Sequence, residues 1–393
     1  MVHQFQFRLY CRSFQQPLQT HHGLWHERQG ILARLTDEAG YVGFGEIAPL
    51  PWFGSETQIQ AAKLCQQLPT QLSKSEIQAI PATLPACRFG VESAWQQLAR
   101  SQSPLHPNRP QPEPDISTLC GLLPTGVAAL THWCDLWGQG YRTLKWKIGV
   151  APVEQELSLF QQLVQSIQTQ IQSRTGAPEI SKIPPAIAPP LNKGGRGDRH
   201  AIYEFEEFGS SSPESRARAV KLRLDANGGL SVAAAERWLQ VCDALAMGDG
   251  LGVEVEFLEQ PLPVGEEVAM QQLASQYQTP LALDESVATL QDLQRCCDRG
   301  WSGIVVIKPS IAGFPSQLRQ VCCDRNLDWV LSSVFETAIG RQAIFQLAEN
   351  LVADAKEQGR KAPNRALGFG LSHWFPANDP LSANRAETLW QNC

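Results

Sequence analysis

The feature that most constrains the fold is a regular alternation of short apolar runs with helix-length segments from about residue 117 onward. This alternation is typical of parallel strand–helix–strand units. The predicted strands end near eight residues: Leu122, Lys147, Asp225, Glu259, Asp284, Lys308, Ser332 and Gly368. Eight is the number of strands that closes a TIM-type (β/α) barrel, so we predict an α/β fold of this class.

One interval between strand ends is too long for a single helix. Subtracting residue numbers gives 78 residues between Lys147 and Asp225, whereas the other intervals run from 24 to 36 residues. The long interval contains a segment rich in Pro, Gly and Ser, residues 173–215. Such a composition cannot bury enough apolar surface to offset the entropy lost on ordering. We therefore interpret 173–215 as a mobile surface insertion in the barrel.

The first hundred residues follow another pattern. Residues 3–10 alternate apolar and polar side chains, which indicates a half-buried strand, and 31–47 read as a hairpin. We expect a polar loop at 12–28, between this strand and the hairpin. Helical patterns follow over 57–71 and 88–100. Strands first and helices after them are typical of a small α+β domain.

The length of 393 residues also favours more than one hydrophobic core. We predict an N-terminal α+β capping domain at 1–110 and a barrel at 111–369. Residues 370–393 are expected to leave the barrel and return to the capping domain.

Composition excludes several classes of protein. The formal net charge is -6, so a surface for neutralising nucleic-acid phosphates is not expected. No stretch has the apolar length of a membrane span or of a signal peptide, so we expect no membrane association. The 11 cysteines are odd in number and match no zinc spacing, which favours reduced thiols in the cytoplasm. Oligomeric state stays open.

Three carboxylates, Asp225, Glu259 and Asp284, stand at the ends of three successive predicted strands. In a TIM barrel these ends form the active-site face. Carboxylates are costly to bury there unless they are paired or bound to a metal. An all-oxygen ligand set suits Mg²⁺, or Mn²⁺ in its place, and no His at a strand end argues for zinc. We predict that the three acids bind a divalent cation.

Three lysines share the same predicted face. Lys145 and Lys147 are two residues apart on the second strand, so their side chains point the same way. Two ammonium groups in one site repel each other, which favours the neutral amine that a general base needs. Lys308 ends the sixth strand, on the opposite side of the barrel. A metal ion acidifies the α-proton of a bound carboxylate, so we predict proton abstraction from a small-molecule carboxylate.

Three polar residues are weaker candidates for substrate binding. Asn227 shares a face with Asp225 and either supports the metal site or bonds a neighbour. Ser332 and Ser333, at the seventh strand, either bind a substrate carboxylate or satisfy the strand end.

The motifs that carry these residues together resemble the enolase superfamily, in its muconate-lactonizing-enzyme-like branch. The motifs are Leu144–Lys147, Asp225–Asn227, Leu258–Pro261, Leu283–Ser286 and Ile307–Pro309. The resemblance implies a barrel with a capping domain and Mg²⁺ bound by the three acids. It also implies roles for the lysines. Lys147 abstracts the α-proton and returns it to a departing hydroxide, Lys145 tunes Lys147, and Lys308 holds the enediolate.

Within the superfamily, three further segments resemble the o-succinylbenzoate synthase family: Gly43–Pro51, Leu331–Gly340 and Leu367–Leu371. This similarity implies a lyase that dehydrates a succinyl-hydroxycyclohexadiene carboxylate on the route to menaquinone or phylloquinone. The insertion departs from the family pattern and leaves the motif residues intact.

Other functions remain open at this point. An N-acylamino acid racemase or a dipeptide epimerase needs the same metal and both lysines. Dipeptide epimerases tend to carry Asp-x-Asp at the eighth strand, where this chain has Gly368-Phe369-Gly370. A cycloisomerase, or a metal-stabilised scaffold without catalysis, would be the remaining alternatives.

Overall fold

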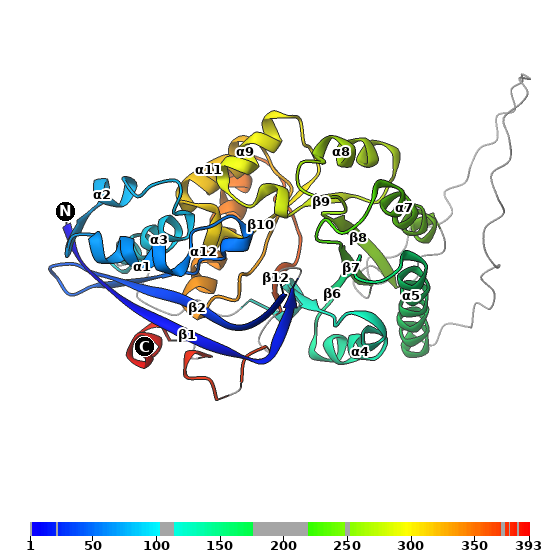
Figure 1. Cartoon of the computed structure of the whole chain (residues 1–393), viewed down its shortest axis with the longest axis horizontal. Coiled ribbons are helices and arrows are strands. Elements are labelled where there is room, and N and C mark those ends of the chain that lie inside the picture. The colour runs from blue at the N-terminus through cyan, green and yellow to red at the C-terminus, as the bar shows by residue number, and fades with distance from the viewer. Residues whose placement is uncertain are drawn as a thin grey trace, which may run out of the picture.

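A computed structural model describes residues 2–20, 23–102, 114–175, 219–247, 252–370, 374–376, 378–382 and 385–393. Two bodies lie side by side, an antiparallel sheet with its helices and a barrel (Figure 1). The predicted insertion at 173–215 falls outside the described residues, apart from its first three. No helix in the described part of the chain is both long and apolar enough to cross a bilayer. All 11 cysteines are described, and all are free thiols.

The barrel consists of eight parallel strands in the order β11-β10-β9-β8-β7-β6-β5-β12. The strands are β5(Leu119–Leu122), β6(Thr143–Lys147), β7(Val220–Asp225), β8(Val253–Glu259), β9(Leu281–Leu283), β10(Ile304–Ile307), β11(Trp329–Leu331) and β12(Leu367–Gly370). The predicted fold class is confirmed, and each predicted strand end falls at or next to the end of a strand or, for Gly368, within the last one.

The barrel closes through a narrow seam between β11 and β12. A single parallel bridge joins Ser332 to Gly368, and the Ser333 N–H donates to the Gly368 carbonyl at 3.2 Å. A Cβ on Gly368 would lie 2.7 Å from the Ser332 hydroxyl oxygen, and a Cβ on Gly370 would lie 2.3 Å from the Cys120 carbonyl oxygen. Gly370 is therefore required by the close approach of the Cys120 backbone, and Gly368 by the close approach of the Ser332 side chain.

Helices surround the barrel and supply the outer half of its core. They are α4(Ala129–Gln139), α5(Val153–Thr175), α7(Val232–Met247), α8(Glu267–Gln276), α9(Leu290–Asp298), α10(Pro309–Ala312), α11(Pro315–Asp324) and α12(Ala338–Glu357), with 3-10 turns η2(Ile116–Thr118), η3(Gly126–Ala128) and η4(Glu285–Val287). Trp146 of β6 and Trp238 of α7 are almost fully buried and meet edge to face at 6.3 Å. Such large rings dominate the apolar area that holds helix on strand.

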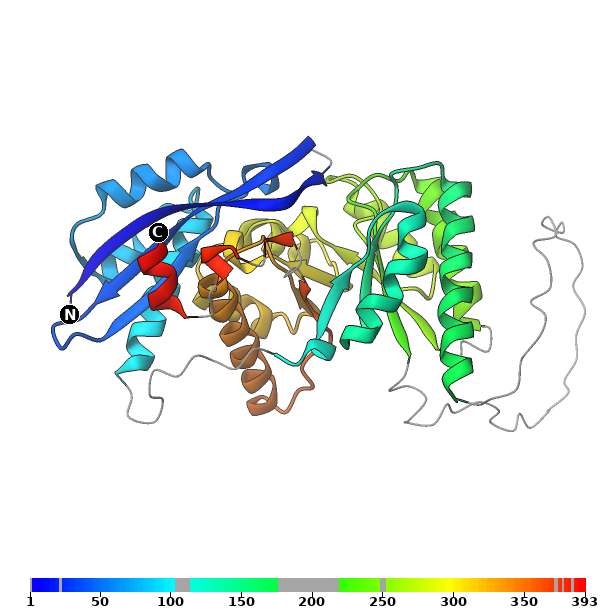
Figure 2. The same ribbon diagram turned by 90° about the horizontal axis from the view of Figure 1, so that it is seen from below.

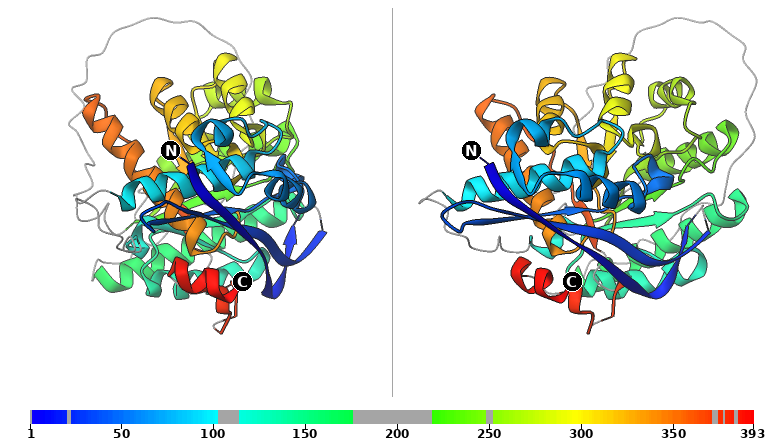
Figure 3. Two further views of the ribbon diagram at one scale, coloured as in Figure 1. Left: turned by 90° about the vertical axis from the view of Figure 1, so that its left-hand side faces the viewer. Right: turned by 60° about the vertical axis from the view of Figure 1, so that its left-hand side comes forward.

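The other body is a four-stranded antiparallel sheet in the order β3-β2-β1-β4, with helices packed on one face. Its elements are β1(Val2–Thr20), β2(Gly23–Thr36), β3(Val42–Ile47), η1(Pro51–Phe53), α1(Gln58–Gln67), β4(Gln71–Ser73), α2(Lys74–Gln78) and α3(Pro85–Ser101). Helix α3 lies directly on β3, because Gly43 and Gly45 leave no Cβ between the two backbones. Figure 3 shows the long hairpin of β1 and β2 running from this body toward the barrel.

The expectation of a polar loop at 12–28 is wrong. Strands β1 and β2 continue through most of this range, with Arg12 opposite Arg28, and the register shifts between Ser13 and Leu18. Backbone pairing needs no apolar side chains, and a few aromatic residues anchor the hairpin. The Phe14 ring lies 4.9 Å from Trp25, which the polarity pattern of the sequence does not reveal.

The end of the chain packs on the four-stranded sheet. Its elements are η6(Pro380–Ser382) and α13(Ala386–Asn392). Leu389 and Trp390 of α13 cluster with Tyr10, Leu32 and Phe44 of the sheet (Figure 2). The Arg12 guanidinium also donates to the Asp379 carboxylate at 2.7 Å.

Candidate active site

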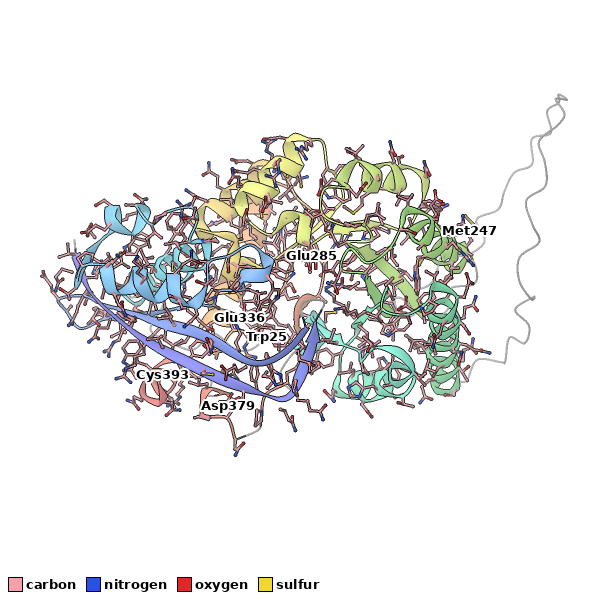
Figure 4. All side chains as sticks on the ribbon, in the orientation of Figure 1. Trp25, Met247, Glu285, Glu336, Asp379 and Cys393 are labelled. Carbon is pink, nitrogen blue, oxygen red and sulfur yellow. The ribbon has the colours of Figure 1, made fainter. Side chains whose placement is uncertain are left out.

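A cavity of about 730 Å³ lies where the carboxyl ends of the barrel strands face the β1–β2 hairpin and η1. All nine candidate site residues line it: Lys145, Lys147, Asp225, Asn227, Glu259, Asp284, Lys308, Ser332 and Ser333. Figure 4 places Glu285, Glu336 and Trp25 in the same central region, whereas Met247 lies at the far end of the barrel.

The three predicted metal ligands are buried carboxylates with exposures of 5%, 1% and 2% for Asp225, Glu259 and Asp284. Asp225 and Glu259 end the adjacent strands β7 and β8 in the same register. Burial, together with the charges of Asp225 and Asp284, raises the pKa of Glu259 to about 8, against the lowering effect of Lys145. Burial also raises the pKa of Asp284. The site therefore concentrates negative charge that needs cationic partners.

Lys145 bridges two of these acids. Its Nζ lies 2.8 Å from Asp225 Oδ2 and 2.8 Å from Glu259 Oε1. Burial opposes the charged form, but the carboxylates of Asp225, Glu259 and Asp284 outweigh burial and raise the pKa of Lys145 well above its ordinary value. The expectation of a neutral amine is therefore wrong for Lys145, because the charged groups in contact with it are carboxylates and not the ammonium group of Lys147. Lys308, across the barrel, is paired with Asp284.

The donor set fits a hard divalent cation in chemistry. Three buried carboxylates converge on one cavity, and oxygen ligands are what Mg²⁺ prefers. Within the described ranges, however, no trio of His, Cys, Asp or Glu side chains is arranged to hold a metal ion as it stands. Lys145 and Lys308 each pair with one oxygen of these carboxylates. The metal ligands accordingly remain a prediction.

Asn227 supports the acid beside it. Its backbone N–H donates to Asp225 Oδ1 at 3.0 Å, and its side-chain amide donates to Asp225 Oδ2 at 3.3 Å and to Glu285 Oε1 at 3.0 Å. These contacts orient Asp225, so the structure favours a supporting role over a direct contact with substrate.

Gln260 is a site residue that sequence reasoning missed. Its side chain is fully buried, and its Oε1 accepts the N–H groups of Asp284 at 3.0 Å and of Ser286 at 3.2 Å. Its backbone has a positive φ of 36°. Gln260 thereby ties the end of β8 to the end of β9 and sets the position of Asp284. The signal available in the sequence was its place directly after Glu259.

The loop after β11 is held by a second buried acid that sequence reasoning missed, Glu336. Ser333 donates its hydroxyl proton to Glu336, the Val334 N–H donates at 2.9 Å, and Ser310 donates at 3.0 Å. Burial raises the pKa of Glu336. The Ser333 hydroxyl in turn accepts the Phe335 N–H at 2.9 Å. Ser333 is thus engaged in shaping the loop, and substrate binding by Ser332 and Ser333 remains a prediction.

The opposite wall of the cavity is apolar and comes largely from the capping body. It includes Leu18, Trp25, Leu50, Trp52 and Phe53. The Trp25 ring meets Phe335 of the barrel at 5.3 Å. A cavity with charged groups on one wall and aromatic rings on the other suits a small carboxylate that carries an unsaturated ring.

Two family patterns match the chain. The family described as "MenC, N-terminal domain" matches residues 3–98, and the one described as "Enolase C-terminal domain-like" matches residues 214–357. The o-succinylbenzoate synthase of Thermosynechococcus vestitus is 36% identical over 390 residues, covering 98% of each chain. That of Mycobacterium ulcerans is 30% identical over 168 residues, covering 41% of this chain and 49% of its own.

Solved structures agree in fold. The o-succinylbenzoate synthase of Thermosynechococcus elongatus, described as complexed with Mg in the active site, superposes with a TM-score of 0.72 at 36% identity, covering 99% of this chain and 100% of that one. The L-Ala-D/L-Glu epimerase of Bacillus subtilis reaches a TM-score of 0.63 at 16% identity, covering 96% and 92%, which shows a shared fold alone. The chain therefore belongs to the o-succinylbenzoate synthase family of the enolase superfamily, whose activity is that of a hydro-lyase.

Proposed function

We propose that three lysines and three acids of this cavity divide the work of o-succinylbenzoate synthesis as follows. The substrate is 2-succinyl-6-hydroxy-2,4-cyclohexadiene-1-carboxylate. Lys147 takes the proton from the ring carbon that bears the carboxylate. It then gives this proton to the hydroxyl group that leaves from the same face, so the products are 2-succinylbenzoate and water. One residue can serve both steps because both bonds break on one side of the ring.

The observation that carries this assignment is the state of the three lysines. Among the described residues, Lys145 and Lys308 are engaged in ion pairs, whereas Lys147 lines the same cavity without one. A general base must be available to the substrate proton, and an ammonium group held between two carboxylates is not. Lys147 is therefore the best placed of the three to exchange a proton.

The other two lysines act through their charge. Lys308 directly follows β10, which is four strands away from β6 in an eight-stranded barrel, and so it faces Lys147 across the cavity. Its ammonium group is placed to stabilise the negative charge that develops on the substrate carboxylate. Lys145 orients Asp225 and Glu259 and adds positive charge next to Lys147.

We propose Asp225, Glu259 and Asp284 as the ligands of Mg²⁺, with Mn²⁺ as an alternative. Their burial, their oxygen donors and the raised pKa of Glu259 support this assignment. When bound there, the metal supplies a Lewis acid that makes the α-proton of a carboxylate more acidic.

The division into a capping domain at 1–110, a barrel at 111–369 and a C-terminal return at 370–393 also remains a proposal, as do a cytoplasmic location and a place in menaquinone or phylloquinone synthesis. The packing of α13 on the sheet supports the C-terminal return.

The test compares dehydration of the purified substrate by the wild type and by Lys147→Ala. The reaction is measured as the loss of diene absorbance. General acid–base catalysis contributes about 10²–10⁴-fold, so Lys147→Ala should lose about 10²–10⁴-fold in kcat. Calorimetry should show that Mg²⁺ still binds to the variant. Near-normal turnover by Lys147→Ala would remove Lys147 from its role.

Racemisation of an N-acylamino acid is the second candidate, because lysines on both sides of a cavity can exchange a proton from either face. Incubation in D₂O with N-acylamino acids measures it. Deuterium exchange at rates that rival dehydration would reverse the order of the two functions.

A further inference from the structure

The aromatic ring of Phe53, which comes from the capping body, lies over the ammonium group of a barrel lysine. Lys308 Nζ is 3.8 Å from the centroid of the Phe53 ring. Both residues line the cavity, and the Lys308 side chain is only 11% exposed. The face of a benzene ring attracts a cation within about 6 Å, and the attraction grows when water is excluded.

The turn that carries Phe53 fixes the place of its ring. The Phe53 N–H donates to the Leu50 carbonyl at 2.9 Å, and the Gly54 N–H donates to the Pro51 carbonyl at 3.1 Å. Gly54 takes a positive φ of 95°, which glycine adopts without strain. The Ser55 hydroxyl accepts the Leu50 N–H at 2.6 Å and closes the turn. These hydrogen bonds therefore hold the Phe53 ring in a fixed position.

A ring and a carboxylate hold an ammonium group in different ways. Asp284 attracts Lys308 with a full negative charge, which also cancels much of the field that Lys308 offers to a substrate. The Phe53 ring carries no net charge, so it holds the ammonium group while leaving its positive charge uncancelled. The contact between the Phe53 ring and Lys308 also persists whatever else the Asp284 carboxylate binds.

We propose that Phe53 is a positioning residue for the reaction, which holds the Lys308 ammonium group by a cation–π contact and directs its charge at the substrate. The inference rests on the proposed function, because it assigns Lys308 to the stabilisation of developing negative charge. If the inference holds, Lys308 is positioned correctly only when the capping body is packed against the barrel. The Phe53 ring thus contributes to kcat through Lys308.

The test replaces Phe53 with phenylalanines carrying one, two and three fluorine atoms. Each fluorine withdraws electron density from the ring face and barely changes its size, so folding is preserved. The expected result is a stepwise linear fall in log kcat, of about tenfold over the series, with KM nearly constant. Phe53→Leu should lose at least as much, and Phe53→Tyr should retain most of the activity.

A matched control uses the same fluorinated residues at Phe335. This ring lines the same cavity but meets the rings of Phe14 and Trp25 at 5.3 Å. A linear trend at Phe53 together with none at Phe335 supports the inference. A flat series at Phe53, or one in which KM alone changes, overturns it, because the ring would then be only a wall for the substrate. Either result leaves wild-type dehydration standing, whereas absence of dehydration by the wild type would refute the proposed function itself.

Discussion

The buried carboxylate of Glu46 should be one of the most costly side chains to remove from this protein. Glu46 lies on β3, has no exposed surface, and accepts hydrogen bonds from both bodies of the structure. Tyr10 Oη donates to it at 2.5 Å from the neighbouring β1, and the N–H groups of Thr337 and Gly340 donate at 2.9 Å and 3.0 Å from the start of α12. Glu46 thus serves as the anion at the N-terminus of a barrel helix.

The magnitude follows from these donors. A hydrogen bond to a charged group contributes about 1.5–3 kcal/mol, and each buried donor left unpaired costs about 1–3 kcal/mol. Glu46→Ala leaves four donors without their acceptor, because the Thr337 hydroxyl also donates to Glu46, so we expect it to lower the free energy of unfolding by about 4 kcal/mol. Tyr10→Phe removes only one donor and should cost about 1–2 kcal/mol.

Urea unfolding followed by circular dichroism measures these free energies, and the double variant completes a thermodynamic cycle. In the Glu46→Ala background the Tyr10 hydroxyl has already lost its acceptor, so Tyr10→Phe should then cost almost nothing. The expected coupling energy is about 1–2 kcal/mol. A loss below about 1 kcal/mol for Glu46→Ala, or strict additivity in the cycle, would refute the reasoning.

Three further predictions concern buried charges. Because burial raises the folded-state pKa of Glu336 above its ordinary 4.5, its contribution to stability is complete below that value and is lost as the pH rises through the folded-state pKa. Glu336→Gln should therefore flatten the decline of unfolding free energy above about pH 4.5 in urea titrations at several pH values, and an unchanged slope would contradict this. Arg223 is 2% exposed and donates to Glu256 at 2.7 Å, so Arg223→Met should destabilise the chain by about 3–5 kcal/mol in urea unfolding. Glu256 keeps its 3.0 Å ion pair with Arg365 in this variant, so the loss should lie at the lower end of that range, and no measurable loss would contradict the pairing with Arg223. Chelation with EDTA should abolish dehydration and added Mg²⁺ should restore it, whereas Asp225→Asn should respond weakly to Mg²⁺; activity that survives chelation would exclude the metal.

The barrel could be predicted because several of its apolar strands are followed at once by a charged residue. Apolar runs followed by Asp225, Glu259 or Lys308 mark the active-site edge, and parallel strands bring such ends together. The hairpin at 12–28 could not be predicted, since its polar composition is typical of a loop and its pairing is a property of the backbone.

The contacts between the two bodies could not be predicted from the sequence either. Glu46 and Thr337 are 291 residues apart, and neither position has a local pattern that points to the other. The approach of Phe53 to Lys308 is of the same kind. The sequence also could not show that Lys145 is held charged, because that depends on which atoms of Asp225 and Glu259 lie nearest.

The single bridge at Ser332 and Gly368 has a consequence for protein engineering. The barrel is joined most weakly where a single bridge connects two strands. Any side chain introduced at Gly368 would clash with the Ser332 hydroxyl, which lies 2.7 Å from the position of its Cβ. Introducing at Gly368 and Gly370 the acidic pair that dipeptide epimerases tend to carry would therefore separate β11 from β12 before it changed the substrate preference. A smaller residue at position 332 would relieve the contact at Gly368, but a side chain at Gly370 would still meet the Cys120 carbonyl oxygen 2.3 Å from its Cβ.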